Sequence, residues 1–383
     1  MGKFYEFFAG GGMARAGLGD AWECLFANDF DHKKSKTYLK NWGEGHLLTE
    51  DIKKLSTHHL PAYADLVWGS FPCQDLSLAG GGAGLKGERS GTFWPFWGLM
   101  EGLAKEGRAP KIIVLENVCG TLTSHGGKDF VAICKALKNE NYRFGALVID
   151  AAKFLPHSRP RLFVVAIHES IHIAPDMAAE EPYNVWHTRA LKNAVNKLPD
   201  DIAENWLWWK LPVPKKKTVS IKQIIEDSPA CVSWHTPDET GQLIAMMSDV
   251  NKMKIVAAQK KSGRQVGFVY KRTRRDSYGR KVQRAEVRFD NIAGCLRTPA
   301  GGSSRQIVII IENEKVRSRL ISSRETARLM GLPDSYILPE RYNEAYHLTG
   351  DGVVVPVVRH LAENIFEPLL LGQKLIQKDK VAA

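Results

Sequence analysis

The sequence contains no Cys-x-x-Cys pair, although it has six cysteines. Cysteines scattered in this way argue against a zinc ribbon and against a disulfide framework. No uninterrupted apolar run approaches the ~20 residues needed to span a bilayer. The first residues also lack the basic, apolar and small-residue regions of a secretory signal. We therefore expect a cytoplasmic protein in a reducing compartment, with no membrane association and no metal site.

Two familiar phosphate-binding patterns are missing as well. The sequence has no Gly-x-x-x-x-Gly-Lys-Ser/Thr loop, which argues against an ATPase of the P-loop class. The glycine-rich stretch near the beginning does not form a clean Gly-x-Gly-x-x-Gly pattern either. There is no internal repeat and no long low-complexity linker. The 383 residues, 44% apolar and 25% charged, are ordinary for a globular protein of two domains.

The positive charge of the chain is concentrated in one stretch. The formal net charge is +11. Between Lys252 and Arg288 there are thirteen lysines and arginines, opposed by Asp276 and Glu286 alone, so the rest of the chain is neutral overall. A local basic block in a neutral protein favours a surface that binds a polyanion, and a solvated basic face is the alternative.

A glycine-rich turn follows the first expected strand, at residues 3–8. The turn contains Ala9, Gly10 and Gly12 after Phe8, and glycines at a strand-to-helix turn let the backbone approach a ligand closely. A second expected strand, residues 24–29, ends in Asp29, where a ribose is usually bound. Asp51 lies at a third expected strand end and is positioned to accept from an adenine amino group. Three such features in order predict a nucleoside cofactor.

A thiol and a carboxyl follow two further expected strands. Residues 65–71 and 111–115 are short apolar runs, and Pro72-Cys73-Gln74 and Glu116-Asn117-Val118 come directly after them. Residues just past the carboxyl ends of parallel strands line the ligand crevice. We therefore expect Cys73 and Glu116 to project into one cleft. The alternatives are a buried structural cysteine and a strand-end ion pair.

Cytosine is the substrate that this pair of groups suits. Its C5 atom takes a methyl group only after a thiolate has added at C6, and a carboxyl at N3 stabilises the electron density that develops. Arg159 and Arg161 precede another buried strand, residues 162–167, and would point the same way in an extended segment. They are candidates for holding the base or the catalytic acid, and phosphate or surface contacts explain their spacing equally well.

Together these residues resemble the DNA cytosine-C5 methyltransferase family of prokaryotic or phage type, in the family's order and over most of the chain. The motif matches begin with 8–12, Asn28 with Asp29, and Asp51 with Ile52. They continue with 72–74 and Ser77, 89–93, 116–118, and 159–161. The later matches are 297–302, 324–333 and 350–356. Four positions depart from the family pattern: His157 stands in place of a glutamine, Asp351 and Gly352 in place of an asparagine and a small hydroxyl residue, and Ala79 where serine is frequent.

The resemblance implies S-adenosylmethionine as cofactor, double-stranded DNA as partner, and a set of site residues. Cys73, Glu116, Arg159 and Arg161 would be catalytic. The cofactor would contact Phe8, Ala9, Gly10, Gly12, Leu18, Asp29, Phe30, Asp51, Ile52, Pro72, Asp351, Gly352 and Val353. DNA would contact Gln74, Ser77, Arg89, Arg272, Arg274, Arg275, Arg297 and Thr298.

The expected fold is α/β. A Rossmann-like methyltransferase domain with a mostly parallel sheet would comprise residues 1–170, completed by 315–383. A smaller, mainly irregular and β target-recognition domain would comprise 171–314. Within the first domain, residues 92–107 and 127–140 are expected helices, in the alternation typical of βαβ units.

The resulting hypothesis is a monomeric enzyme that methylates C5 of a cytosine flipped out of a specific DNA sequence, through a Cys73–C6 intermediate assisted by Glu116. It would act on DNA in a prokaryotic cytoplasm, with a cognate restriction endonuclease as a further partner. A tRNA cytosine-C5 methyltransferase is one alternative. A catalytically silent DNA-binding protein on the same scaffold is another. The proline-proline-aromatic tetrapeptide of amino-methylating DNA enzymes is absent.

Overall fold

The computed structural model describes residues 1–72, 90–214, 219–276, 278–297 and 305–373. These residues form two compact units. Unit 1 is built from residues of 1–150, of 160–213 and from 354 onward, and unit 2 from residues of 151–159 and 214–353. Among the helices that the structure describes, none has the length and apolar character of a membrane-spanning segment.

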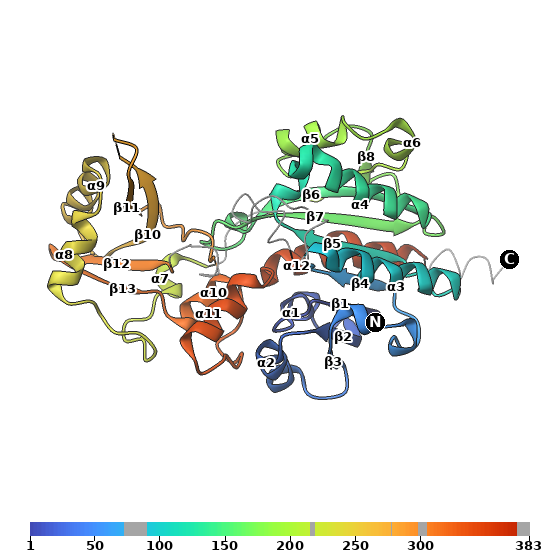
Figure 1. Ribbon diagram of the computed structural model, residues 1–383, viewed down its shortest axis with the longest axis horizontal. Helices are drawn as coiled ribbons and strands as arrows, with labels where there is room; N and C mark the ends of the chain where they lie inside the picture. The colour runs from blue at the N-terminus through green and yellow to red at the C-terminus, as the bar shows by residue number, and fades with distance from the viewer. Residues whose placement is uncertain (73–89, 215–218, 277, 298–304, 374–383) are drawn as a thin grey trace. The chain divides into compact units, whose positions relative to one another are not determined.

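Unit 1 contains a seven-stranded sheet with the strand order β3-β2-β1-β4-β5-β7-β6. Strands β1 to β5 run parallel to one another. Strand β7 runs antiparallel to both β5 and β6. In Figure 1, α3 and α4 cross in front of this sheet and α12 passes behind it. The strands are β1 (Gly2–Phe7), β2 (Trp22–Asp29), β3 (Leu47–Thr49), β4 (Leu66–Gly69), β5 (Ile112–Asn117), β6 (Tyr142–Asp150) and β7 (Pro160–His168). The helices are α1 (Met13–Leu18), α2 (His32–Trp42), α3 (Phe93–Lys105), α4 (Lys128–Asn139) and α12 (Val355–Leu361), which continues as the π-helical segment η9 (Ala362–Phe366).

The mostly parallel sheet confirms the predicted α/β class. All four residues of β4 and all six of β5 are buried, as expected for continuous apolar strands covered on both faces. The two expected helices are α3 and α4. One detail differs: Glu116 and Asn117 are the last residues of β5 rather than the first residues after it.

Residues 171–213 pack on the β6 side of unit 1. Phe144 in β6 exchanges backbone hydrogen bonds with Asn205 and Leu207, and the indole N–H of Trp209 donates to the carbonyl of Val165 at 3.2 Å. The segment contains β8 (Ala178–Ala179), α5 (Arg189–Val195), α6 (Asp200–Ala203) and β9 (Trp208–Trp209). By contacts, therefore, 171–213 lies with unit 1 and 315–353 with unit 2, whereas the sequence suggested boundaries at 170 and 315. The recognition role assigned to 171–314 stays a prediction.

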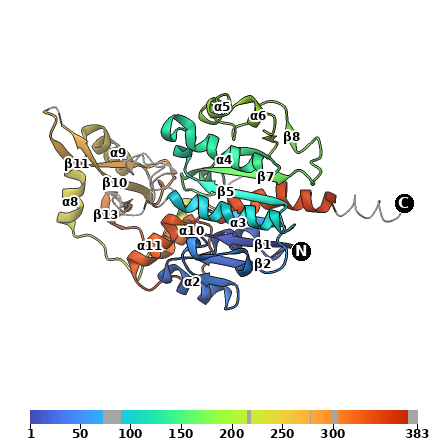
Figure 2. The same ribbon diagram turned by 45° about the vertical axis from the view of Figure 1, so that its right-hand side comes forward.

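Unit 2 contains a four-stranded antiparallel sheet with the order β11-β10-β12-β13. Two helices, α8 and α9, supply Leu243, Ile255 and Ala258 to its core, which also contains Val269 and Ile309 from the sheet. Figure 2 shows α8 and α9 beside these strands. The elements are α7 (Ile221–Ile224), α8 (Pro237–Ala245), α9 (Asp249–Gln259), β10 (Gln265–Arg275), β11 (Lys281–Arg288), β12 (Ile307–Glu312), β13 (Lys315–Leu320), α10 (Ser323–Leu329) and α11 (Tyr342–Asp351).

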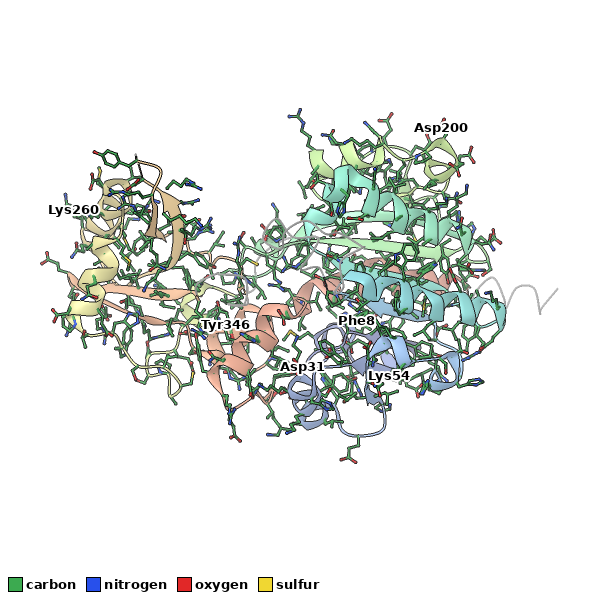
Figure 3. The ribbon with its side chains drawn as sticks, in the orientation of Figure 1. Phe8, Asp31, Lys54, Asp200, Lys260 and Tyr346 are labelled. Carbon is green, nitrogen blue, oxygen red and sulfur yellow. The ribbon has the colours of Figure 1, made fainter. Side chains whose placement is uncertain are left out.

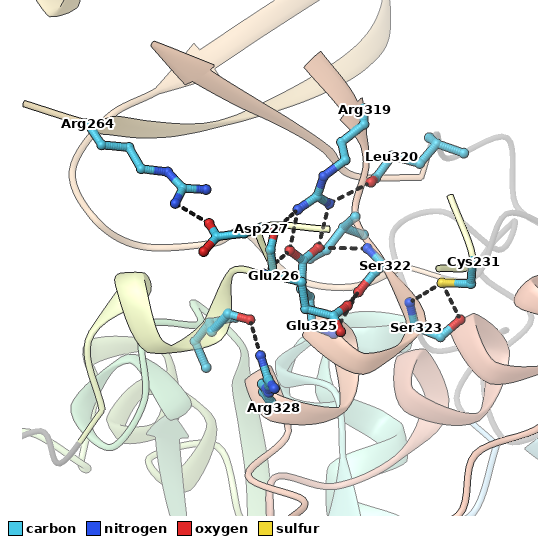
Figure 4. A network of polar contacts seen from close by, with 12 residues as sticks. Glu226, Asp227, Cys231, Arg264, Arg319, Leu320, Ser322, Ser323, Glu325 and Arg328 are labelled. Atoms are coloured by element: carbon cyan, nitrogen blue, oxygen red, sulfur yellow. Dashed lines mark hydrogen bonds and ion pairs between the residues drawn. The ribbon is translucent and has the colours of Figure 1, made fainter. Parts of the chain in front are cut away.

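A buried ion pair ties distant segments of unit 2 together. The guanidinium of Arg319 in β13 donates to both carboxylate oxygens of Glu325 in α10, at 2.8 and 2.5 Å, and neither side chain is exposed. The backbone amides of Glu226 and Ser322 also donate to Glu325, at 2.8 and 2.7 Å. Figure 4 shows this network around the start of α10. It joins the segment after α7 to the end of the sheet.

Candidate active site at the carboxyl edge of the sheet

The residues of interest in unit 1 gather at one edge of the sheet. Phe8 follows β1, Asp29 ends β2, Asp51 follows β3, Pro72 follows β4 and Glu116 lies near the end of β5. Because these strands are parallel and adjacent, their carboxyl ends meet at the same edge, where α/β proteins bind ligands. Figure 3 labels Phe8 and also Asp31, the residue that precedes α2.

The turn after β1 has a backbone shape that few residues adopt. Phe8 has φ 57°, and Gly10 and Gly12 have φ 55° and 76°. A Cβ atom on Gly12 would lie 2.3 Å from the indole nitrogen of Trp42, whereas a Cβ on Gly10 would have no atom of the described residues within 4 Å. The same indole N–H donates to the carbonyl of Gly11 at 3.0 Å. Trp42 therefore fixes the turn from one side, and the space beside Gly10 is open.

Asp29 links the turn to the end of β2. One carboxylate oxygen accepts from the backbone amide of Gly10 at 2.7 Å, and the other accepts from that of Asp31 at 2.8 Å. Burial raises the pKa of this carboxyl. Each carboxylate oxygen has a second lone pair for a ligand hydroxyl. Phe30, the next residue, is 67% exposed.

Asp51 and Ile52 lie where β3 ends. A carboxylate oxygen of Asp51 accepts from the amide of Lys53 at 3.0 Å and so caps a short 3₁₀ turn, Ile52–Lys54. Asn28 donates from its side-chain amide to the carbonyls of Leu48 and Glu50, which holds β2 against β3. By contrast, Leu18 is completely buried at the end of α1, so its predicted cofactor contact receives no support from the structure.

Glu6 is a buried carboxyl that sequence reasoning did not single out. It lies in β1, and one oxygen accepts from the amide of Arg15 in α1 at 3.4 Å. The other oxygen has no hydrogen-bond partner among the described residues. Burial raises the pKa of Glu6 to about 8, against the lowering effect of Arg15. The signal in the sequence is a single acid among the aromatic residues of the first strand.

Glu116 and Arg161 come together at this edge, which is one of the arrangements that the sequence left open for the arginine. The guanidinium Nε of Arg161 lies 3.3 Å from a carboxylate oxygen of Glu116, and the two side chains are 17% and 9% exposed. The reversed direction of β7 explains the meeting, since its beginning pairs with the end of β5, Leu162 opposite Asn117. Cys119 lies close enough that the charge of Arg161 partly opposes the rise of its pKa on burial.

Several predicted residues lie outside the described part of the chain. They are Cys73, Gln74, Ser77, Arg89 and Thr298. The chain that leads to Cys73 is described up to Pro72. The side-chain amide of Asn117 donates to the carbonyl of Phe71 at 3.4 Å, so the end of β5 holds the segment that follows β4.

Arg159 has different partners and belongs to unit 2. Its guanidinium is buried and donates to three backbone carbonyls, those of Leu296, Gly350 and Gly352, at 3.2, 2.8 and 2.8 Å. It thereby holds both neighbours of Asp351, the position at which the family pattern is broken. Val353, at the end of this segment, is buried. These contacts favour a positioning role for Arg159.

His157 occupies a fully buried position in unit 2. Its Nε2 accepts from the amide of Leu296 at 3.3 Å, which leaves Nδ1 to donate to the carbonyl of Leu329 at 3.0 Å. The ring thus bridges two backbone segments as a neutral imidazole. A glutamine amide, which also has one donor and one acceptor, is equipped for the same two contacts.

Most of the basic block lies on the hairpin β10–β11 of unit 2, and its first residues lie on α9 and between α9 and β10. Arg272, Arg274 and Arg275 are exposed on β10, and Arg297 is exposed after β11. Glu286 on β11 makes ion pairs with both Arg272 and Arg274.

Comparison with known proteins gives a consistent result. The family model for C-5 cytosine-specific DNA methylase matches residues 2–367. The Type II methyltransferase M.DsaV of Dactylococcopsis salina is 26% identical over 381 residues, covering 99% of this chain and 90% of the relative. M.HhaI of Haemophilus parahaemolyticus, also a Type II methyltransferase, is 25% identical, covering 95% and 94%.

Solved structures share the fold. EhMeth, a methyltransferase of Entamoeba histolytica, superposes with a TM-score of 0.64 at 16% identity, over 96% of this chain and 99% of that one. The S. pombe Dnmt2 methyltransferase gives a TM-score of 0.57 at 17% identity, with the same coverage.

Proposed function

Because the chain belongs to the C-5 cytosine-specific DNA methylase family, and is therefore a DNA cytosine-5-methyltransferase, we propose that it methylates a cytosine flipped out of a specific double-stranded sequence, with S-adenosylmethionine as donor. The observation that carries the proposal is the pairing of Glu116 with Arg161 where β5 ends. A buried carboxyl held by a guanidinium, one strand away from the segment leading to Cys73, suits activation of a pyrimidine.

The residues at the edge of β1 to β3 fit S-adenosylmethionine. The open space beside Gly10 admits close approach to the backbone. Asp29 retains lone pairs for ribose hydroxyls, and the exposed ring of Phe30 offers a flat surface to an adenine. When bound, the cofactor supplies an electrophilic methyl group on its sulfonium.

The protein's own groups act on the cytosine. The thiolate of Cys73 adds to C6, and the electron pair of the C5–C6 double bond moves into the ring toward N3. Glu116 stabilises this density by holding or donating a proton at N3. C5 would then bond to the methyl carbon as the bond from that carbon to the sulfonium sulfur breaks, and the sulfur would keep the electron pair as a neutral thioether. Loss of the C5 proton restores the C5–C6 double bond as the thiolate leaves C6. Arg161 keeps the Glu116 carboxyl in place throughout.

Access to C6 requires that the base leave the helical stack. Extruding one nucleotide costs a few kcal/mol, which binding to the phosphate backbone has to offset. The exposed arginines of β10 are suited to this task. The relatives M.DsaV and M.HhaI are Type II methyltransferases, and we extend the proposal to a cognate restriction endonuclease acting at the same DNA sequence.

Replacing the nucleophile tests the proposal directly. Cys73→Ala is expected to abolish methyl transfer while DNA binding survives, and Cys231→Ala, an exposed cysteine of unit 2, is the matched control. DNA containing 5-fluorocytosine should trap a covalent complex with the wild type and with Cys231→Ala but not with Cys73→Ala. Retained methylation by Cys73→Ala would refute the assignment.

The choice of nucleic acid is tested by the same preparation. Radiolabelled methyl transfer to duplex DNA and to tRNA should show incorporation into DNA. Incorporation into tRNA alone would replace the proposal by the tRNA-methylating alternative. DNA binding with no transfer to either would favour a silent DNA-binding protein.

A further inference from the structure

The hairpin β10–β11 presents two unlike faces. In its antiparallel register Tyr270 lies opposite Glu286 and Arg272 opposite Arg284, and alternate residues of each strand share a face. One face therefore carries Arg272, Arg274, Arg284 and Glu286. Residues of the other face, such as Val269, enter the core of unit 2. Around Tyr270 and Glu286, where the opposite face is covered by the core, the charged face is the side that a ligand can reach.

Glu286 is the only acidic residue in the two strands, and it is shared by two arginines. One carboxylate oxygen accepts from Nε of Arg274 at 2.8 Å, and the other lies 3.3 Å from Nε of Arg272. The carboxylate is 34% exposed and the two guanidinium side chains 45% and 50%, so water and ions reach all three. Arg272 also lies over the ring of Tyr270, 5.9 Å from its centroid.

These ion pairs are weak enough for another anion to replace Glu286 at each arginine. An exposed ion pair contributes about 0 to 1 kcal/mol, so a second anion competes for each arginine at little cost. Like charges directly opposite on neighbouring strands destabilise a hairpin, and Arg272 faces Arg284. Glu286 thus offsets repulsion in the free protein and occupies the donors that a phosphate would use.

We propose that Glu286 is a specificity residue that weakens sequence-independent DNA binding by competing with phosphate for Arg272 and Arg274. This inference rests on the proposed function, since it takes duplex DNA as the ligand. In a non-target complex, the affinity comes almost entirely from ion pairs with DNA phosphates. The protein can slide along the duplex until its available arginines contact phosphates. In the target complex, base contacts and the extruded cytosine fix the register. Competition by Glu286 therefore lowers the affinity for non-target DNA more than the affinity for the target sequence.

The test compares Glu286→Gln with Glu314→Gln. Both remove one negative charge from the sheet region of unit 2, but Glu314 lies in the turn between β12 and β13. Binding of a short random duplex, followed by fluorescence anisotropy over a range of salt, should be about tenfold tighter for Glu286→Gln at low salt. The slope of log affinity against log salt should steepen by about one to two units, one for each arginine released to a phosphate.

Two further measurements make the result specific. On the target duplex, identified by bisulfite sequencing of DNA from cells expressing the protein, Glu286→Gln should gain less affinity, so the ratio of target to random binding falls several-fold. In a protein that also carries Arg272→Gln and Arg274→Gln, the Glu286→Gln change should give no gain, because the arginines it releases are gone.

The possible outcomes distinguish a failure of this inference from a failure of the proposed function. Failure of the wild type to bind or methylate duplex DNA would refute the proposed function. A wild type that methylates DNA, together with equal shifts for Glu286→Gln and Glu314→Gln, would overturn the specificity role and leave the function intact. Weaker binding of random DNA by Glu286→Gln would also overturn it, and would mean that the carboxylate holds the arginines in their binding geometry.

Discussion

Glu6 and Glu116 are both buried carboxyls of the parallel sheet, and their partners set them apart. Glu116 lies beside a guanidinium, whereas one oxygen of Glu6 has no hydrogen-bond partner among the described residues. Burial without a partner favours the protonated form of a carboxyl, which applies to Glu6. The first arrangement suits an acid that has to stay in a fixed position, and the second stores a proton beside the glycine turn.

The protonation of Glu6 makes stability depend on pH. The folded state keeps the proton up to about pH 8, while the unfolded chain releases it near its ordinary value of 4.5. Within that window the unfolded state binds fewer protons, so the free energy of unfolding falls as pH rises. Glu6→Gln should remove this fall, worth about 1 to 4 kcal/mol across the window.

Urea unfolding of both proteins at several pH values measures the effect. Glu23→Gln, which changes an exposed acid of β2, is the control and should keep the wild-type dependence. If Glu6→Gln shows the same dependence as the wild type, Glu6 is ionised in the folded protein and the assignment is wrong.

At the scale of elements, the glycine turn depends on a helix that follows the next strand. Trp42, the last residue of α2, donates to Gly11 and lies against Gly12. Arg15 stacks on the same indole, 5.0 Å from the ring centroid. The turn is therefore fixed by side chains that are about thirty residues apart in sequence.

Trp42→Phe keeps an aromatic ring and removes the hydrogen bond to Gly11. We expect binding of S-adenosylmethionine to weaken about five- to tenfold, the value of one neutral hydrogen bond. Isothermal titration measures it, and kcat at saturating cofactor should change little. Trp94→Phe, at an exposed position of α3, is the control. An unchanged affinity in Trp42→Phe would show that the turn holds its shape without this bond.

Some elements and contacts of unit 1 could be predicted from the sequence, and others could not. Strands such as β4 and β5 were predictable because short apolar runs ended by turn residues are typical of buried strands. The sequence left the meeting of Glu116 and Arg161 open, because it depends on the antiparallel direction of β7. The packing of the residues around Trp209 against unit 1 was not predictable. The spacing of these tryptophans has neither helical nor strand periodicity, so the sequence does not indicate which element they contact. The partners of Arg159 are backbone carbonyls, which leave no trace in a sequence.

For the molecule as a whole, the buried pair of Arg319 and Glu325 is the junction on which unit 2 depends. The carboxylate also receives the amides of Glu226 and Ser322, so segments about a hundred residues apart meet there (Figure 4). A buried charge is stable only while an opposite charge and hydrogen bonds compensate for the loss of water.

Arg319→Met should destabilise the protein by about 3 to 5 kcal/mol, because it leaves the Glu325 carboxylate buried and unpaired. Combining it with Glu325→Gln should cost less than the sum of the two single changes, since the second change removes the stranded charge. Chemical denaturation measures all three. Arg317→Met, two residues earlier on β13, is the control. Simple additivity would mean that the pair does not act as a unit.

The packing of α1 against α12 has a consequence for the order of events during synthesis. A Cβ on Gly17 would lie 2.4 Å from Cβ of Val358, and Arg359 donates to the carbonyl of Leu18, so helices from opposite ends of the polypeptide fit without a gap. While the ribosome is still translating the middle of the message, the earliest helix has no cover on this side. Unit 1 consequently completes the packing around α1 only after the residues of unit 2 have been synthesised, so its folding cannot finish before unit 2 has emerged.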